Sequence, residues 1–202
     1  MGGGSSINGQ FFNRGCPSDY DEWQALGAQG WSWDQVLPYF KKVERDLDFD
    51  GPLHGKEGRI PVRRILPDAW PGHPLAMAEA LEQAGYKYLP DQNGVFEDGY
   101  FPIAISNENE RRVSAAMAYL DPQTRRRPNL TIRANSHVSR LLFEGNRCGG
   151  IEVQVDGHAI QFSAREVIVS AGAIHSPALL MRSGVGPAAP LQAHGVPLVA
   201  DV

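Results

Sequence analysis

Up to residue 128, apolar side chains recur at helical spacing between stretches rich in turn residues. The clearest case follows Ser32, where the spacing predicts a helix from Trp33 to Asp46. Its apolar positions are Val36, Leu37, Phe40, Val43 and Leu47. We expect shorter helices over residues 18–26, 74–84 and 114–120. The second of these is expected to end at Gly85.

Strands are expected to be few in this part of the chain. Residues 48–74 contain many Gly, Pro and Asp residues, so we expect mostly loop there, interrupted by a strand at 59–63. A weak alternation predicts another strand at 101–105.

From Asn129 onward the pattern changes to that of β-strands. Candidate strands cover residues 130–134, 138–143, 151–155 and 159–162. Asp156-Gly157 between the last two is typical of a tight hairpin turn. These residues therefore predict a three-stranded meander.

The run from Glu166 to Ser170 is continuously apolar at its centre, as in a strand that is buried on both faces of a parallel sheet. A small-residue turn follows, with Ser176 as the expected helix cap, Pro177 as the first helical residue and Gly184 as the stop. A strand, a glycine turn and a capped helix form an α/β unit, and such folds bind ligands at that turn. Without its neighbouring strands this one would expose an apolar edge, which favours a homo-oligomer.

Composition narrows the class of protein. Of 202 residues, 42% are hydrophobic and 21% are charged, which is typical of globular domains. The net charge of -4 argues against nucleic acid as the main partner, and we interpret the basic cluster at 125–127 as a solvated loop. No apolar stretch is long enough for a transmembrane segment. Two cysteines and the lack of a signal peptide predict a reducing, cytoplasmic location, and six scattered histidines predict no metal site.

Two segments contain residues suited to binding a ligand. Gly2-Gly3-Gly4 followed by Ser5-Ser6 permits close approach of the backbone to an anion, although such a run by itself is more often a linker. The strand–glycine–helix joint near residue 172 is also common in proteins that bind nothing there. Their joint occurrence is more informative than either one.

Residues 2–15, followed by Asp21, resemble the first signature of the glucose–methanol–choline (GMC) oxidoreductase family. Residues 172–187 resemble the second signature, position for position. Between them, residues 119–120, 127–131 and 138–143 also resemble the family pattern. The resemblance covers nearly the whole chain and is strongest to the choline-dehydrogenase-like bacterial members.

The resemblance implies that nine residues contact a bound FAD. The loop along its pyrophosphate and flavin would contain Gly3, Gly4, Ser5, Asn8 and Gly9. The backbone of Val138 would meet the adenine, and the turn beside the nucleotide would contain Ala171, Gly172 and Ala173. Ile7 stands where some choline-oxidising relatives have a flavin-linked histidine, so the resemblance implies non-covalent FAD.

The implied fold class is α/β with some α+β character. It would combine part of a Rossmann-like FAD-binding domain with part of a substrate-binding domain that contains an antiparallel sheet. Residues 1–60 would supply the FAD-binding loop and helices, residues 61–128 part of the substrate-binding domain, and residues 129–202 the return to the FAD-binding domain.

The sequence also departs from the family pattern. It contains no GxGxxG turn, and none of its six histidines matches the family's catalytic histidine, so no catalytic residue is named. We therefore expect an internal piece of a longer enzyme, beginning at an internal methionine and inactive when isolated.

Three functions fit the sequence to different degrees. The first is a piece of an FAD-dependent dehydrogenase or oxidase. Such an enzyme transfers a hydride from the CH–OH group of a small alcohol to flavin N5. The alternative is a non-catalytic α/β module that does not retain FAD, or that acts only as a structural or partner piece. A hydrolase has little support, because Ser176 and Ser183 lack a GxSxG turn. The sequence leaves open which alcohol is oxidised and which electron acceptor is used.

Overall fold

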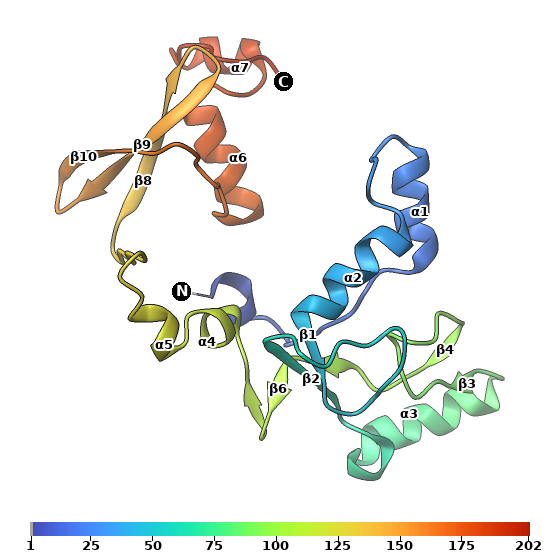
Figure 1. Cartoon of the computed structure of the whole chain (residues 1–202). Helices are drawn as coiled ribbons and strands as arrows, with labels where there is room; N and C mark the ends of the chain where they lie inside the picture. The colour runs from blue at the N-terminus through green and yellow to red at the C-terminus, as the bar shows by residue number, and fades with distance from the viewer. Residues whose placement is uncertain (1) are drawn as a thin grey trace. The chain divides into compact units, whose positions relative to one another are not determined.

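The computed structural model describes residues 2–202, and it divides into two compact units, Met1–Arg127 and Pro128–Val202 (Figure 1). Both units mix helices and strands, which confirms the predicted α/β class. Among residues 2–202, no helix has the length and apolar character needed to cross a membrane.

The helices of the first unit follow the predicted order. They are η1 (Gly3–Ser6), α1 (Pro17–Ala25), α2 (Trp33–Val43), η2 (Pro67–Ala69), α3 (Gly72–Gln83), α4 (Ala115–Tyr119) and α5 (Pro122–Arg125). The predicted helices at 18–26, 74–84 and 114–120 are confirmed as α1, α3 and α4. Gly85 follows α3 with φ +90°, the left-handed conformation that ends a helix.

The predicted helix at 33–46 is wrong at its end, because α2 stops at Val43 and the chain continues as strand β1 (Glu44–Asp46). This strand pairs in parallel with Ile60–Val62. The carboxylates of Glu44 and Asp46 are thereby fully buried among cations, a long-range interaction that outweighs the local helical pattern.

The central sheet of the first unit is small. Its strands lie in the order β1, β2 (Ile60–Arg64) and β5 (Ala104–Ile105), and β5 pairs antiparallel with β2. Two further strand pairs are β3 (Lys87–Tyr88) with β4 (Gly99–Tyr100), and β6 (Asn107–Glu108) with β7 (Arg111–Arg112). The strand predicted at 59–63 is confirmed as β2, and of the one predicted at 101–105 only β5 is formed.

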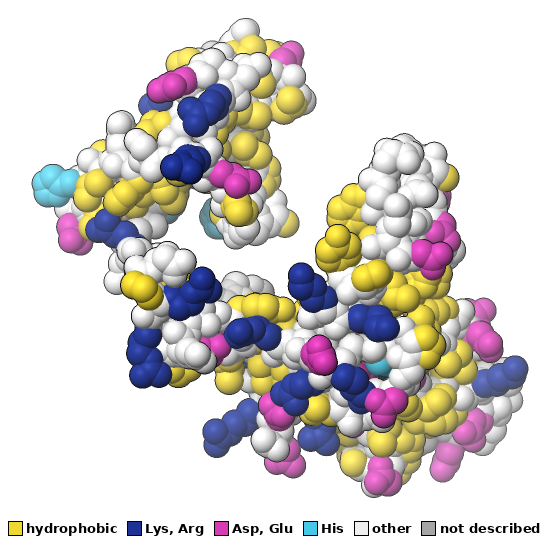
Figure 2. All heavy atoms as spheres, viewed as in Figure 1, with side chains coloured by type: hydrophobic (Ala, Val, Ile, Leu, Met, Phe, Trp, Pro, Cys, Tyr) yellow, Lys and Arg dark blue, Asp and Glu magenta, His cyan; other side chains and the backbone are white. Residues whose placement is uncertain are grey.

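Apolar packing in this unit is limited. The buried cluster consists of Ile60, Val62 and Ala104, with Phe12 and Ala118 packed against it. Aromatic rings join α1 to α2, where Tyr20 lies 5.4–5.8 Å from Trp23, Trp33 and Phe40. Figure 2 shows hydrophobic side chains at the surface of both units.

The second unit contains the predicted meander. Strands β8 (His137–Glu144), β9 (Arg147–Val155) and β10 (His158–Ser163) form one antiparallel sheet in the order β10-β9-β8. Asp156 and Gly157 both have positive φ, 49° and 80°, as the tight hairpin turn requires. Helix α6 (Gly172–Arg182) contacts β8, and α7 (Ala188–Ala193) follows.

Two predicted strands of this unit are not formed. Residues 130–134 and 166–170 have no strand conformation, and Ile168 is 82% exposed. A strand is stabilised by pairing with a neighbour, and none of the strands in residues 2–202 pairs with either segment. The apolar character of a segment is therefore not sufficient to predict that it forms a strand.

Helix α6 also begins earlier than predicted. It starts at Gly172 instead of Pro177, so Pro177 lies inside the helix. Ser176 does not cap a helix that follows it, because its hydroxyl accepts a hydrogen bond from the amide of Ala171, 2.9 Å away. The predicted stop is confirmed, since Gly184 follows the helix with φ +93°.

Candidate functional site

The glycine-rich loop of the first unit is compact and open on one side. Gly3 and Gly4 begin η1, and the amides of Ile7 and Asn8 donate to the carbonyl of Gly4 at 3.1 and 2.8 Å. A Cβ atom added at Gly3 or at Gly4 would meet nothing within 4 Å. The backbone of these two glycines is therefore accessible to a ligand.

The side chains of Ser5 and Asn8 bond to the protein itself. The Ser5 hydroxyl donates to the carbonyl of Gly2 at 2.5 Å and accepts from the amide of Ala115 at 2.9 Å. Asn8 Oδ1 accepts from the amide of Gln10 at 3.0 Å and from Arg112 Nη1 at 2.8 Å. These side chains fix the shape of the loop. Because they are engaged with the protein itself, the groups available to a ligand are those of the backbone.

The remaining residues of the loop face outward or pack locally. Ile7 is 86% exposed, so its side chain is not part of a core. Gly9 lies against the ring of Phe11, since an added Cβ would come within 3.2 Å of Phe11 Cζ.

In the second unit, the predicted residues Val138 and Ala171 line one cavity of about 620 Å³. They come from β8 and from the residue before α6. Gly172, with φ +91°, and Ala173 follow directly as the first residues of α6. The walls are mostly apolar, and sequence reasoning did not identify these other lining residues: Leu141, Ile151, Val167, His175, Leu179 and Arg182.

Each group of residues, taken by itself, has features that fit a part of an FAD molecule. An apolar cavity bordered by backbone suits a planar adenine ring, which is bound by packing and by hydrogen bonds at its edge. Glycines with free space beside them, such as Gly3 and Gly4, permit a phosphate or a flavin to approach the backbone. The five loop residues lie in the first unit and the other four lie in the second.

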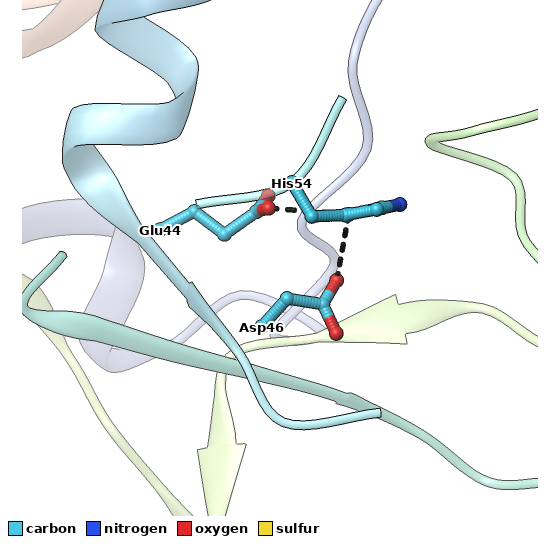
Figure 3. A group of neighbouring side chains, drawn as sticks. All are labelled: Glu44, Asp46 and His54. Carbon is cyan, nitrogen blue, oxygen red and sulfur yellow. Dashed lines mark hydrogen bonds and ion pairs between the residues drawn. The ribbon is translucent and has the colours of Figure 1, made fainter. Parts of the chain in front are cut away.

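A cluster of six buried ionisable side chains lies in the first unit, and one of them, Arg14, closely follows the glycine-rich loop in the sequence. Its cations are Arg14, His54 and Arg64, and its anions are Glu44, Asp46 and Asp91. No side chain among them is more than 8% exposed. Figure 3 shows His54 directed toward the carboxylates of Glu44 and Asp46. We call these six side chains the ionic cluster.

Each cation of the ionic cluster contacts at least one carboxylate. Arg64 donates to Asp46 Oδ2 at 2.6 Å and to Asp91 Oδ1 at 2.7 Å. His54 Nε2 lies 2.8 Å from Asp91 Oδ2, and its Nδ1 lies 3.0 Å from Asp46 Oδ2. Arg14 pairs with Glu44. With three cations and three anions, the cluster is neutral when all of its members are ionised.

Burial and hydrogen bonding set the protonation of the ionic cluster. Burial alone would lower the pKa of His54, but hydrogen bonds to Asp46, Asp91 and Glu44 raise it to about 10. Burial would raise the pKa of Asp46, but hydrogen bonds from His54 and Arg64 hold it well below its usual value. The same balance lowers the pKa of Asp91. His54 is therefore an imidazolium at neutral pH.

A metal ion is the other interpretation of this cluster. Ligand atoms of Glu44, Asp46 and His54 lie within 4.8 Å of one another. However, guanidinium groups already bond to both carboxylates, since Arg14 donates to Glu44 and Arg64 donates to Asp46. The donor set therefore fits an ion-pair cluster and not a cation site.

The ionic cluster anchors the loop that follows the glycines. The amide of Arg14 donates to Asn93 Oδ1 at 3.1 Å, and Asn93 Nδ2 donates to the carbonyl of Phe12 at 2.9 Å. Sequence reasoning missed this arrangement, because its partners are separated by as many as 81 residues and have no local pattern.

Comparison with known proteins assigns nearly the whole chain to one family. The family model for GMC oxidoreductases matches residues 1–198. The chain belongs to the GMC oxidoreductase family. The resemblance of the two signatures to this family is thereby confirmed, and so is the likeness to choline dehydrogenases. Members of this family are FAD-dependent oxidoreductases.

Individual relatives share the full length of the chain. A 5-(hydroxymethyl)furfural oxidase of Methylovorus sp. (strain MP688) is 52% identical over 202 residues, which is 100% of this chain and 38% of the relative. An oxygen-dependent choline dehydrogenase of Brucella ovis is 41% identical over 204 residues, 100% of this chain and 36% of the relative. The chain thus spans less than two fifths of either relative.

Solved structures share the fold. A pyridoxine 4-oxidase from Mesorbium loti superposes with a TM-score of 0.90 at 36% identity, covering 98% of this chain and 39% of that protein. The formate oxidase of Aspergillus oryzae RIB40 gives a TM-score of 0.87 at 28% identity, covering 100% of this chain and 36% of that one.

Proposed function

We propose that this chain supplies the cofactor-binding part of an FAD-dependent enzyme that oxidises the CH–OH group of a small alcohol. Two of the relatives named above are a 5-(hydroxymethyl)furfural oxidase and a choline dehydrogenase, and both names refer to substrates that carry a hydroxyl group. FAD, when bound, accepts a hydride from the alcohol carbon at flavin N5. No residue of this chain is proposed to take the hydroxyl proton.

The main support for the proposal is the cavity of the second unit. Val138 and Ala171 are far apart in the sequence, were assigned to one nucleotide site by the family resemblance, and line the same cavity. In this proposal, the cavity binds the adenine end of FAD, with Gly172 and Ala173 beside the nucleotide. The backbone of Gly3, Gly4 and Gly9 lies along the pyrophosphate and flavin, in a loop shaped by Ser5 and Asn8.

The cofactor is proposed to be bound without a covalent link. Ile7 has no nucleophilic atom to attach to the flavin, and its side chain is exposed. By the same assignment, residues 1–60 and 129–202 belong to the FAD-binding domain and residues 61–128 to the substrate-binding domain. A cytoplasmic location stays a prediction from the cysteine count.

One observation favours the alternative of a module that does not retain FAD. The apolar residues 166–170 directly precede Ala171 and are not held in a sheet, so one wall of the cavity is not fixed by strand pairing. Ordering this segment on binding would cost conformational entropy and weaken affinity. It also leaves an apolar segment free to mediate self-association.

The test is an absorption spectrum of the purified chain, taken as isolated and again after mixing with FAD and desalting. We expect flavin bands to remain with the protein. Gly4→Val should abolish this retention, because the added side chain has no protein neighbour within 4 Å and fills the space proposed for the ligand.

Gly149→Val is the matched control, since an added Cβ there also meets nothing within 4 Å, but on strand β9. It should retain as much FAD as the unchanged chain. A chain that never retains FAD would favour the non-catalytic module. Equal retention by Gly4→Val and the unchanged chain would refute the assignment of the loop.

A further inference from the structure

The loop is fastened from outside by one side chain. Arg112 is the second residue of β7, in a hairpin whose turn residues Asn109 and Glu110 both have positive φ, 51° and 61°. Its Nη1 donates to the carbonyl of Ser5 at 3.0 Å and to Asn8 Oδ1 at 2.8 Å. Its Nη2 donates to the carbonyl of Asn8 at 2.6 Å. Three hydrogen bonds thus join a short hairpin to a loop more than 100 residues earlier.

The charge of Arg112 has no local counter-ion. Arg14, Arg45, Arg59 and Arg64 each pair with a carboxylate, whereas within residues 2–202 no carboxylate oxygen lies within 4.0 Å of the Arg112 guanidinium. Its known partners are neutral oxygens of the loop. Arginine is suited to this task, since its planar fork can reach two neighbouring oxygens in a fixed geometry. Removing the Arg112 side chain would therefore leave no buried anion without its partner.

We infer that Arg112 is a positioning residue, which holds the glycine-rich loop in the curve that binds FAD. The inference rests on the proposed function. Arg112 bonds to Ser5 and Asn8, the two residues whose side chains shape the loop, and it leaves the backbone of Gly3 and Gly4 free. Without the three hydrogen bonds, the glycines would sample many conformations, and the chain would lose that entropy on binding.

The first measurement needs no cofactor. In the full chain, amide hydrogen exchange is followed at Ile7 and Asn8, which donate within the loop. Arg112→Met should lower their protection at least tenfold. Arg111→Met is the matched control, because it removes the same charge from the same hairpin at an exposed side chain, and it should leave their protection unchanged. Unchanged protection in Arg112→Met would overturn the inference.

The second measurement is the dissociation constant for FAD, from quenching of flavin fluorescence. Arg112→Met should raise it at least tenfold and Arg111→Met less than twofold. Arg112→Lys keeps the positive charge but lacks the planar guanidinium group. Its dissociation constant for FAD should therefore lie between those of the unchanged chain and Arg112→Met. Equal affinity in all four proteins would mean that the loop conformation is irrelevant to the cofactor, which overturns the inference.

The two measurements separate this inference from the proposed function. If the unchanged chain binds no FAD, the proposed function fails and the role of Arg112 toward the cofactor fails with it. The exchange result would then still decide whether Arg112 fastens the loop. If the unchanged chain binds FAD and Arg112→Met binds it equally, only the role of Arg112 is wrong.

Discussion

The ionic cluster predicts an unusual dependence of stability on pH. The pKa of His54 rises from 6.5 to about 10 on folding, so between these values the folded protein holds a proton that the unfolded chain releases. The contribution of His54 to the free energy of unfolding is complete below pH 6.5. It decreases as pH rises and is lost above about pH 10.

The size of this effect follows from proton linkage. One proton held by the folded protein alone gives a slope of up to about 1.4 kcal/mol per pH unit. Between pH 7 and pH 9 the loss therefore reaches roughly 2–3 kcal/mol, a large part of the roughly 5–15 kcal/mol that stabilises a typical domain. At acidic pH, the lowered pKa values of Asp46 and Asp91 make stability change in the opposite direction, so that it decreases as pH falls. Their contribution is present above pH 3.8 and is lost as pH falls below it.

The assay is urea denaturation followed by tryptophan fluorescence at a series of pH values. All four tryptophans lie in the first unit, so their emission reports on the unit that contains the ionic cluster. We expect the greatest stability between about pH 4 and pH 6.5 and a steady decrease toward pH 9.

His54→Gln removes the titrating group and leaves the carboxylates with one cation fewer. It should cost about 3–5 kcal/mol near neutral pH, as expected when one member of a buried ion pair is removed, and the slope above pH 6.5 should disappear. His158→Gln is the control, because His158 is exposed and bonds only to a backbone carbonyl. If the unchanged chain is equally stable at pH 6.5 and pH 9, then His54 is not protonated in the fold and the assignment of charges is wrong.

Two further predictions concern the second unit, where amide hydrogen exchange in β8–β10 is the readout. Gly150→Ala should destabilise by about 1–3 kcal/mol, since its Cβ would lie 2.3 Å from the carbonyl oxygen of Phe162. Gly149→Ala on the same strand should change stability by less than about 0.5 kcal/mol, and equal effects would refute this reasoning. Ser183→Ala should cost about 1–3 kcal/mol, because the buried Ser183 hydroxyl accepts from the amide of Leu141 at 2.8 Å, and an effect near zero would mean that this amide finds another partner.

Local signals were sufficient for the elements that depend only on neighbouring residues. Helix α4 is capped by Ser114, whose hydroxyl accepts from the amide of Met117, and α3 ends at a glycine in the left-handed region. The hairpin between β9 and β10 requires two residues with positive φ, and Asp156-Gly157 supplies them. Each of these features is determined within about four residues of the chain.

Where the partner is remote, the sequence pattern was misleading. Glu44 and Asp46 stand at the end of a helical pattern, and their conformation is set by Arg14, His54 and Arg64. The opposite error occurred at residues 166–170, where a strongly apolar run has no strand beside it in residues 2–202. In both cases the deciding interaction is long-range, and its partners cannot be read from the spacing of residues in one window.

The first signature therefore combines two different tasks. Residues 3–9 leave backbone exposed and fit a ligand, but residues 10–12 pair with the edge of the sheet at Phe11 and Ile105. The amide of Phe12 donates to the carbonyl of Ala104, and the amide of Ser106 donates to the carbonyl of Gln10. Arg14 then fixes the end of this segment in the ionic cluster. Among the described residues of the first unit, ten polar or charged residues are buried, against seven apolar ones, of which two are Pro61 and Pro102.

Such a polar interior specifies one arrangement, because each displaced member would leave a buried charge or hydrogen-bonding group without its partner. Through Arg14 and Asn93, that specificity extends to the segment directly after the glycines. Arg112 fixes the same loop from its other side through Ser5 and Asn8. A loop rich in glycine, which would otherwise be flexible, is thus held by two arginines whose importance no local pattern reveals.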